Sequence, residues 1–149
     1  MSAFLLTFLL ALAISAASAR ADDGAKLRAD AVVVFKAFWN ATGYLIACPK
    51  YVGETPPYLD AAEEWKQRHD PYLARMTAVF KRYGDLSATE KDRIAGEALQ
   101  NAQISLEQRG DSGAYCFGLD EELRSGVFDF DKMDEVAPAL ERLMKASLG

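Results

Sequence analysis

The hydrophobic positions of this chain recur at helical spacing. From residue 26 to residue 47, apolar side chains fall three and four positions apart, which places them on one face of a helix. A second stripe runs from Tyr58 to Tyr83, and a third from Ile94 to Leu106. No segment alternates apolar and polar residues for long enough to predict a strand. We therefore expect an all-α protein.

Prolines and glycines mark the ends of the first two helices. The first helix is expected from Lys26 to Ala47, with Pro49 stopping it. Thr55 is the expected N-cap of the second, with Pro56 at its first position. Gly84 is the expected C-terminal end of that helix.

Two features within and after the second helix refine this prediction. Pro71 either opens a new helix capped by Asp70 or kinks one long helix. The segment Ser87-Ala88-Thr89-Glu90 is a capping box, which predicts the start of a third helix. Because the apolar face of that helix is rich in alanine, we expect a neighbouring helix to approach it closely.

Two further helices are expected in the C-terminal third. One runs from about Ser112 to Arg124 and ends at Gly126, and the last begins near Asp131 or Asp134 and runs to about Ala146. The fourth helix is expected to turn four side chains inward: Ala114, Cys116, Leu119 and Leu123. Together these patterns predict a single-domain bundle of about five helices.

The first 21 residues have the pattern of a cleavable signal peptide. An apolar run from Phe4 to Ile14 is followed by two overlapping A-x-A cleavage frames, residues 17–19 and 19–21. The run is too short to span a hydrocarbon core of roughly 30 Å. We expect cleavage after Ala21, no membrane insertion afterwards, and one mature domain from residue 22 to residue 149.

Charge and cysteine content narrow the environment and the partners. Without the signal peptide the chain has 16 basic and 22 acidic residues, a net charge of −6, which disfavours nucleic acid as a partner. The two cysteines, Cys48 and Cys116, are expected to form a disulfide in an oxidising compartment. These features indicate a secreted protein, and the alanine-rich composition suggests a bacterial periplasm.

His69 is the only histidine, and two interpretations of it stay open. It is either a general base or a half-buried ring packed among aromatic side chains. The segment His69-Asp70-Pro71-Tyr72 resembles the His-Asp pair and following tyrosine of secreted phospholipases A2. That resemblance implies water activation by His69 and calcium binding by Asp70, although it covers only these residues. A small hydrolase using His69 and Asp70 is therefore one hypothesis.

The sequence supports neither a metal nor a cofactor. Four acidic residues, Asp129, Asp131, Asp134 and Glu135, could supply oxygen ligands to calcium. Their order does not match an EF-hand, and helix capping explains them more simply. A single histidine disfavours zinc or copper. We expect no bound metal or cofactor.

Aromatic residues crowd the first two helices and supply the candidate binding residues. Phe35 and Trp39 lie beside the main stripe of the first helix, so this helix is apolar on more than one face. It is either central in the bundle or covered by a partner. Trp65 and Tyr72 lie on the stripe of the second helix, where a cavity beside them would suit an apolar ligand.

From these patterns we expect an exported, acidic helical protein that acts by binding rather than by catalysis. Its partner is expected to be another envelope protein, an unfolded client or a second copy of the chain. The alternatives are the small hydrolase and a carrier of an apolar ligand.

Overall fold

The structure is a computed structural model that describes residues 3–53 and 55–148, with side chains described from residue 22 onward. The elements in chain order are α1 (Ala3–Ala47), α2 (Pro49–Val52), α3 (Leu59–Tyr83), α4 (Ala88–Gln108), α5 (Ser112–Phe117), α6 (Leu119–Ser125), the 3-10 helix η1 (Phe130–Lys132) and α7 (Ala137–Lys145). No strand occurs among these described residues. They share one hydrophobic core, which confirms the predicted all-α single domain.

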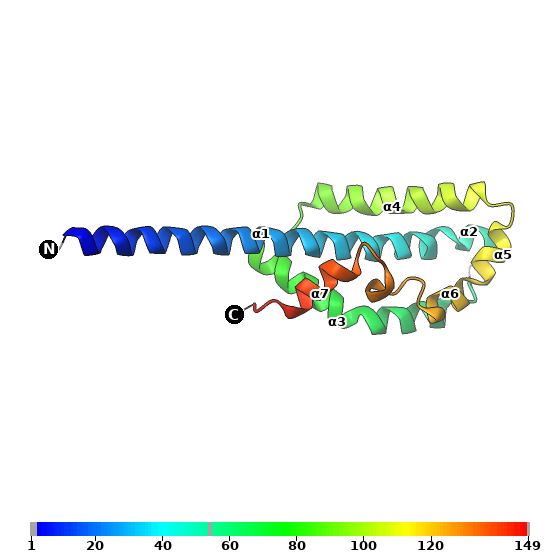
Figure 1. Ribbon diagram of the computed structural model, residues 1–149. Helices are drawn as coiled ribbons and strands as arrows, with labels where there is room; N and C mark the ends of the chain where they lie inside the picture. Colours follow the sequence, from blue (N-terminus) through cyan, green and yellow to red (C-terminus); the bar gives the residue numbers. More distant parts are fainter. Residues whose placement is uncertain (1–2, 54, 149) are drawn as a thin grey trace.

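Helix α1 lies in the middle of the bundle. It contacts α4 on one side and α3 and α7 on the other (Figure 1). Its buried face includes Ala31, Val34 and Ala41, three of the predicted stripe positions. By length and composition alone, Asp22–Val52 is apolar enough to cross a membrane. In the bundle, 39% of that apolar window is buried.

Helix α1 begins at Ala3 and not near Lys26, so the predicted start is wrong. The preceding segment is rich in alanine and leucine, which are strong helix formers, and it contains no proline. Figure 1 shows the first part of α1 projecting beyond the other helices. The predicted signal peptide, residues 1–21, lies outside the residues whose side chains are described.

Helices α1 and α4 approach closely at Gly43. A Cβ atom added there would lie 2.7 Å from the Ala98 carbonyl oxygen and 3.3 Å from the Ala102 Cβ. Real Cβ atoms do not tolerate the first of these distances, so only glycine fits this contact. The close approach predicted from the alanine-rich face of α4 is confirmed.

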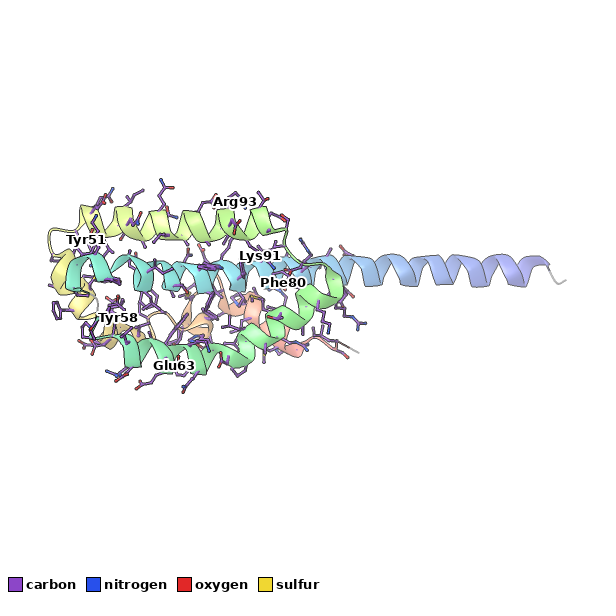
Figure 2. The ribbon with its side chains drawn as sticks, turned by 180° about the vertical axis from the view of Figure 1, so that it is seen from behind. Tyr51, Tyr58, Glu63, Phe80, Lys91 and Arg93 are labelled. Atoms are coloured by element: carbon purple, nitrogen blue, oxygen red, sulfur yellow. A yellow bond between two sulfur atoms is a disulfide. The ribbon has the colours of Figure 1, made fainter. Side chains whose placement is uncertain are left out.

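Helix α3 starts later than predicted and continues through Pro71. Tyr58, not Thr55, occupies the N-cap position. Because Pro57 follows Pro56 directly, Pro56 is disfavoured in helical conformation, and the helix begins beyond both prolines. Pro71 lies within one helix, which bends along its course (Figure 2). The predicted end is confirmed, since Gly84 has φ 106° and its amide bonds to the Phe80 carbonyl.

The capping box is confirmed, whereas the predicted fourth helix is divided. The Ser87 hydroxyl accepts from the Glu90 amide, and the Glu90 carboxylate accepts from the Ser87 amide, at 3.2 and 2.9 Å. The segment from residue 112 to residue 125 forms α5 and α6, separated at Gly118. Cys116, Leu119 and Leu123 are buried as predicted, but Ala114 is exposed.

The last helix begins at neither Asp131 nor Asp134. Asp131 lies in η1, Asp134 is exposed, and Val136 holds the N-cap position of α7. Pro138 explains the later start. It lacks an amide hydrogen and therefore fits in the first turn, where amides have no helical partner.

The predicted disulfide is confirmed. Cys48 and Cys116 are bonded, and their Cα atoms lie 5.4 Å apart. The bond joins the α1–α2 junction to α5, at the end of the bundle opposite the projecting segment (Figure 1).

Candidate functional site

His69 lies in the hydrophobic core. Its side chain is 2% exposed and contacts the rings of Trp65, Tyr72 and Phe130. Nδ1 is 2.6 Å from the Trp65 carbonyl oxygen, and Nε2 is 3.2 Å from the Phe130 amide nitrogen. A carbonyl only accepts and an amide N–H only donates, so these partners require a neutral ring with its hydrogen on Nδ1. Burial lowers the pKa of His69 and favours this neutral form.

Asp70 does not join His69 in a catalytic pair. Asp70 is exposed, and its carboxylate pairs with Lys66 on the preceding turn of α3 at 3.2 Å. The hydrolase hypothesis required a water-accessible His69 in a pocket, and the buried ring does not meet that condition. The arrangement resembling phospholipases A2 therefore has no geometric counterpart at these two residues.

The four candidate binding residues fall into two groups, which the Phe38 ring connects by contacting both Trp39 and Trp65. Phe35 packs edge-on against Trp39 and Phe80 at ring-centroid distances of 6.3 and 6.2 Å. Trp65 and Tyr72 instead belong to the core around His69. The Trp65 indole is 1% exposed, so it is not part of an outer surface.

The acidic residues near the C-terminus do not converge on a metal site. The Asp129 side chain is 13% exposed and pairs with Arg68 at 3.2 Å and Lys132 at 3.4 Å. Asp131, Asp134 and Glu135 are exposed. Among the described residues, no group of three or more histidine, cysteine or acidic side chains is placed to hold a metal ion.

Three side chains of α3 hold the segment that follows α6. We call residues 126–130 the latch loop. Trp65 Nε1 donates to the Phe128 carbonyl at 3.0 Å, and Arg68 donates to the Asp129 carboxylate at 3.2 Å. His69 Nε2 accepts from the Phe130 amide. Arg68 and His69 lie three and four positions after Trp65, so one side of α3 supplies all three contacts.

A groove of about 700 Å³ lies between α1 and the segment from Phe128 to Val136, and we call it the loop groove. Six of its lining residues are apolar or aromatic: Val33, Ala37, Tyr44, Phe128, Met133 and Val136. Four are polar or charged: Lys36, Asn40, Asp134 and Glu135. An apolar wall with a few polar groups is the usual composition of a binding site. Trp65 and Tyr72 do not line this groove, contrary to the position expected for an apolar-ligand cavity.

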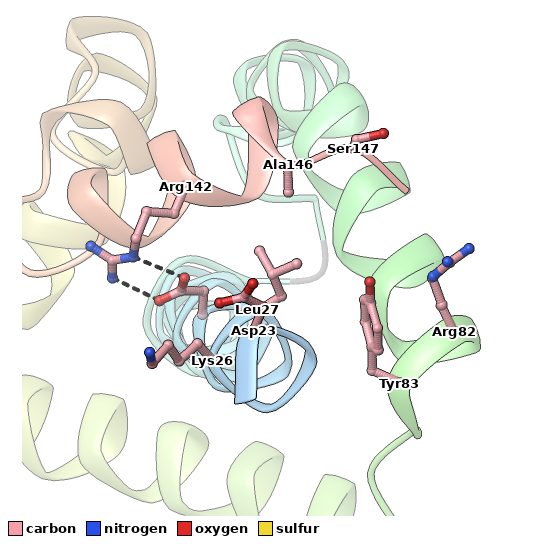
Figure 3. A pocket seen from close by; sticks show the side chains of 9 residues that line it. Asp23, Lys26, Leu27, Arg82, Tyr83, Arg142, Ala146 and Ser147 are labelled. Carbon is pink, nitrogen blue, oxygen red and sulfur yellow. Dashed lines mark hydrogen bonds and ion pairs between the residues drawn. The ribbon is translucent and has the colours of Figure 1, made fainter. Parts of the chain in front are cut away.

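A second groove, of about 570 Å³, lies where α1 leaves the bundle, between the end of α3 and the C-terminal segment. Arg142 and Asp30 form two hydrogen bonds in its wall, at 2.9 and 2.7 Å (Figure 3). Lys26 is also in the wall and pairs with Asp22 at 2.7 Å. The charges of Arg142 and Asp30, and those of Lys26 and Asp22, therefore neutralise each other in pairs.

Sequence reasoning missed most of the loop groove. Phe128, Met133 and Val136 lie in irregular segments or at a helix start, where no periodic pattern identifies a buried or lining position. Their only signal is that large apolar residues occur between acidic ones. No protein family, curated protein or solved structure matches this chain.

Proposed function

We propose that this chain is an exported, non-catalytic protein that binds an amphipathic segment of another polypeptide in the loop groove. The segment carries apolar side chains and a basic residue at one end. The observation that carries the proposal is the apolar lining of the groove beside two acidic side chains, Asp134 and Glu135.

Export is supported by three independent features. The N-terminal apolar run ends in two A-x-A cleavage frames. The projecting part of α1 lies outside the bundle, so removing residues 1–21 is compatible with an intact core (Figure 1). The Cys48–Cys116 disulfide is typical of an oxidising compartment such as the periplasm.

The charge pattern of the groove supports a basic end on the bound segment. Asp134 and Glu135 are exposed, and no ion pair to either of them occurs in the described part of the chain. Lys36, on the α1 wall, is also exposed. A lysine or arginine placed against the two carboxylates gains attraction there and from the net charge of the mature domain.

A pair of synthetic peptides tests this proposal. The probe is a labelled helical peptide of about twelve residues with leucine and phenylalanine on one face and two lysines at one end. The control peptide has glutamate in place of lysine. Fluorescence anisotropy with the oxidised mature protein is expected to show at least about tenfold tighter binding of the lysine peptide, an effect of about 1.4 kcal/mol.

Matched protein variants locate the binding surface. Asn40→Trp places a large ring at an exposed position of the groove and is expected to abolish binding. Gln100→Trp makes the same change at an exposed position of α4 outside the groove and is expected to leave binding unchanged. Asp134→Lys with Glu135→Lys is expected to reverse the peptide preference. Equal binding by the Asn40→Trp and Gln100→Trp variants would overturn the assignment.

A further inference from the structure

One of the side chains that hold the latch loop, His69, has a titratable ring. The Phe130 amide donates to His69 Nε2 at 3.2 Å, and the Phe128 carbonyl accepts from the Trp65 indole at 3.0 Å. The neutral His69 ring has one N–H hydrogen, and it is on Nδ1, facing the Trp65 carbonyl. Nε2 can therefore accept from Phe130 only while the ring is neutral.

Protonation of His69 would place two donors against each other. The imidazolium has a hydrogen on both nitrogens, so Nε2–H would face the Phe130 amide N–H. A buried amide left without an acceptor is destabilising. The ring has almost no contact with water that could compensate.

The charges around the ring determine how readily His69 is protonated. Asp129 Oδ1 lies 3.6 Å from Nε2 and favours the charged ring, as does Asp131. Arg68, one position before His69 on α3, opposes it, and Lys132 pairs with Asp129. The Tyr72 and Phe130 rings add apolar surroundings. Burial has the largest effect and lowers the pKa of His69, so the latch stays closed at neutral pH.

We propose that His69 and the Phe130 amide form an acid-sensitive latch, and that protonation of His69 releases the latch loop from α3 and reshapes the loop groove. Phe128 connects the latch loop to the loop groove. Its carbonyl accepts a hydrogen bond from Trp65, and its side chain lines the groove beside Tyr44. The ring centroids of Tyr44 and Phe128 are 5.9 Å apart, so any movement of the loop alters this wall. The latch is independent of which partner binds, because its readout is the loop itself.

The test follows Trp65 and the loop amides through a pH titration of the oxidised mature protein. Trp39→Phe leaves Trp65 as the reporter, since the chain has two tryptophans and the His69 ring centroid is 4.8 Å from Trp65. We expect a fluorescence transition below the ordinary histidine value of 6.5. Hydrogen exchange corrected for intrinsic rates is expected to show about tenfold lower protection of the Phe130 amide, with α4 unchanged.

Two further variants make the proposal falsifiable. His69→Gln keeps a carbonyl acceptor and removes the titratable ring. The fluorescence transition and the loss of Phe130 amide protection at low pH are therefore both expected to vanish. Asp129→Asn keeps His69 but removes the carboxylate that favours its charged form, so the transition is expected at lower pH. The proposal is overturned if the loop does not respond to acid, if His69→Gln responds like the parent, or if all helices lose protection together.

Discussion

At the scale of single residues, Gly43 controls how closely α1 approaches α4. Gly43→Ala is expected to lower the free energy of unfolding by about 1–3 kcal/mol, because the new methyl group collides with the Ala98 carbonyl and forces the helices apart. Gly96→Ala, at an open position in α4, is the matched control. It is expected to raise that free energy by about 0.5–1 kcal/mol. Chemical denaturation checks both, and equal effects would exclude the close contact.

His69 makes stability depend on pH. Burial lowers its pKa in the folded protein, so the unfolded chain takes up the proton first as the pH falls below 6.5. The stabilising contribution is therefore complete above that value and is lost as the pH falls through the folded pKa. In His69→Gln, the free energy of unfolding measured between about pH 7 and pH 5 is expected to fall less steeply. Parallel curves would contradict this prediction.

Sequence patterns at this scale identify residue types better than partners. The stripe from Tyr58 to Tyr83 correctly placed Trp65 and His69 in the buried face. It could not show that both bind the backbone of the latch loop, because those contacts join residues 61 to 63 positions apart. Contacts this distant depend on the tertiary fold and leave no local periodic signal.

At the scale of elements, one ion pair ties α7 to α1. The Asp30 side chain is 10% exposed, whereas the Arg142 side chain is 60% exposed. Arg142→Met is expected to lower the thermal unfolding midpoint more than Asp30→Asn, because only the first leaves a buried carboxylate without a partner. The double variant is expected to resemble Asp30→Asn. Differential scanning calorimetry checks the order, and an equal loss in both single variants would contradict it.

Helix boundaries were predictable where a local side chain decides them. The capping box at Ser87 and the glycine ends at Gly84 and Gly126 are confirmed. The predicted start at Thr55 is wrong, because two consecutive prolines limit where α3 can begin, and the N-cap of α7 lies two positions after the Asp134 cap that was expected. The sequence pattern placed the start of α3 at a polar side chain that could cap it. In the structure, the start is set by the restricted backbone of the prolines.

At the scale of the whole molecule, the disulfide closes a large loop. Cys48 and Cys116 are 68 positions apart, and the chain-entropy model assigns such a loop roughly 4 kcal/mol. The variant with serine at both positions is expected to lose about that much free energy of unfolding in guanidinium. The reduced parent protein is the control, and its free energy of unfolding is expected to match that of the serine variant. An unchanged midpoint would show that the bundle does not depend on this bond.

The sequence predicted the all-α architecture and the disulfide, and it left open whether α1 is central in the bundle or covered by a partner. It did not predict the loop groove, since Phe128 and Met133 come from irregular segments that only the folded chain brings against Val33 and Tyr44. The candidate site is thus a property of the packing between α1 and a non-helical connection. Helical periodicity carries no information about such a connection.

The central claim is that the exported protein binds a polypeptide in the loop groove, and photo-crosslinking in its own host tests it most directly. A photoreactive amino acid replaces Asn40 in one strain and Gln100 in another, and the products are analysed by non-reducing mass spectrometry. We predict a discrete cross-linked protein from position 40, absent from position 100, on chains that begin at Asp22 and retain the disulfide. The product is expected to disappear with Asp134→Lys and Glu135→Lys. No product from position 40, or the same products from both positions, would contradict the account.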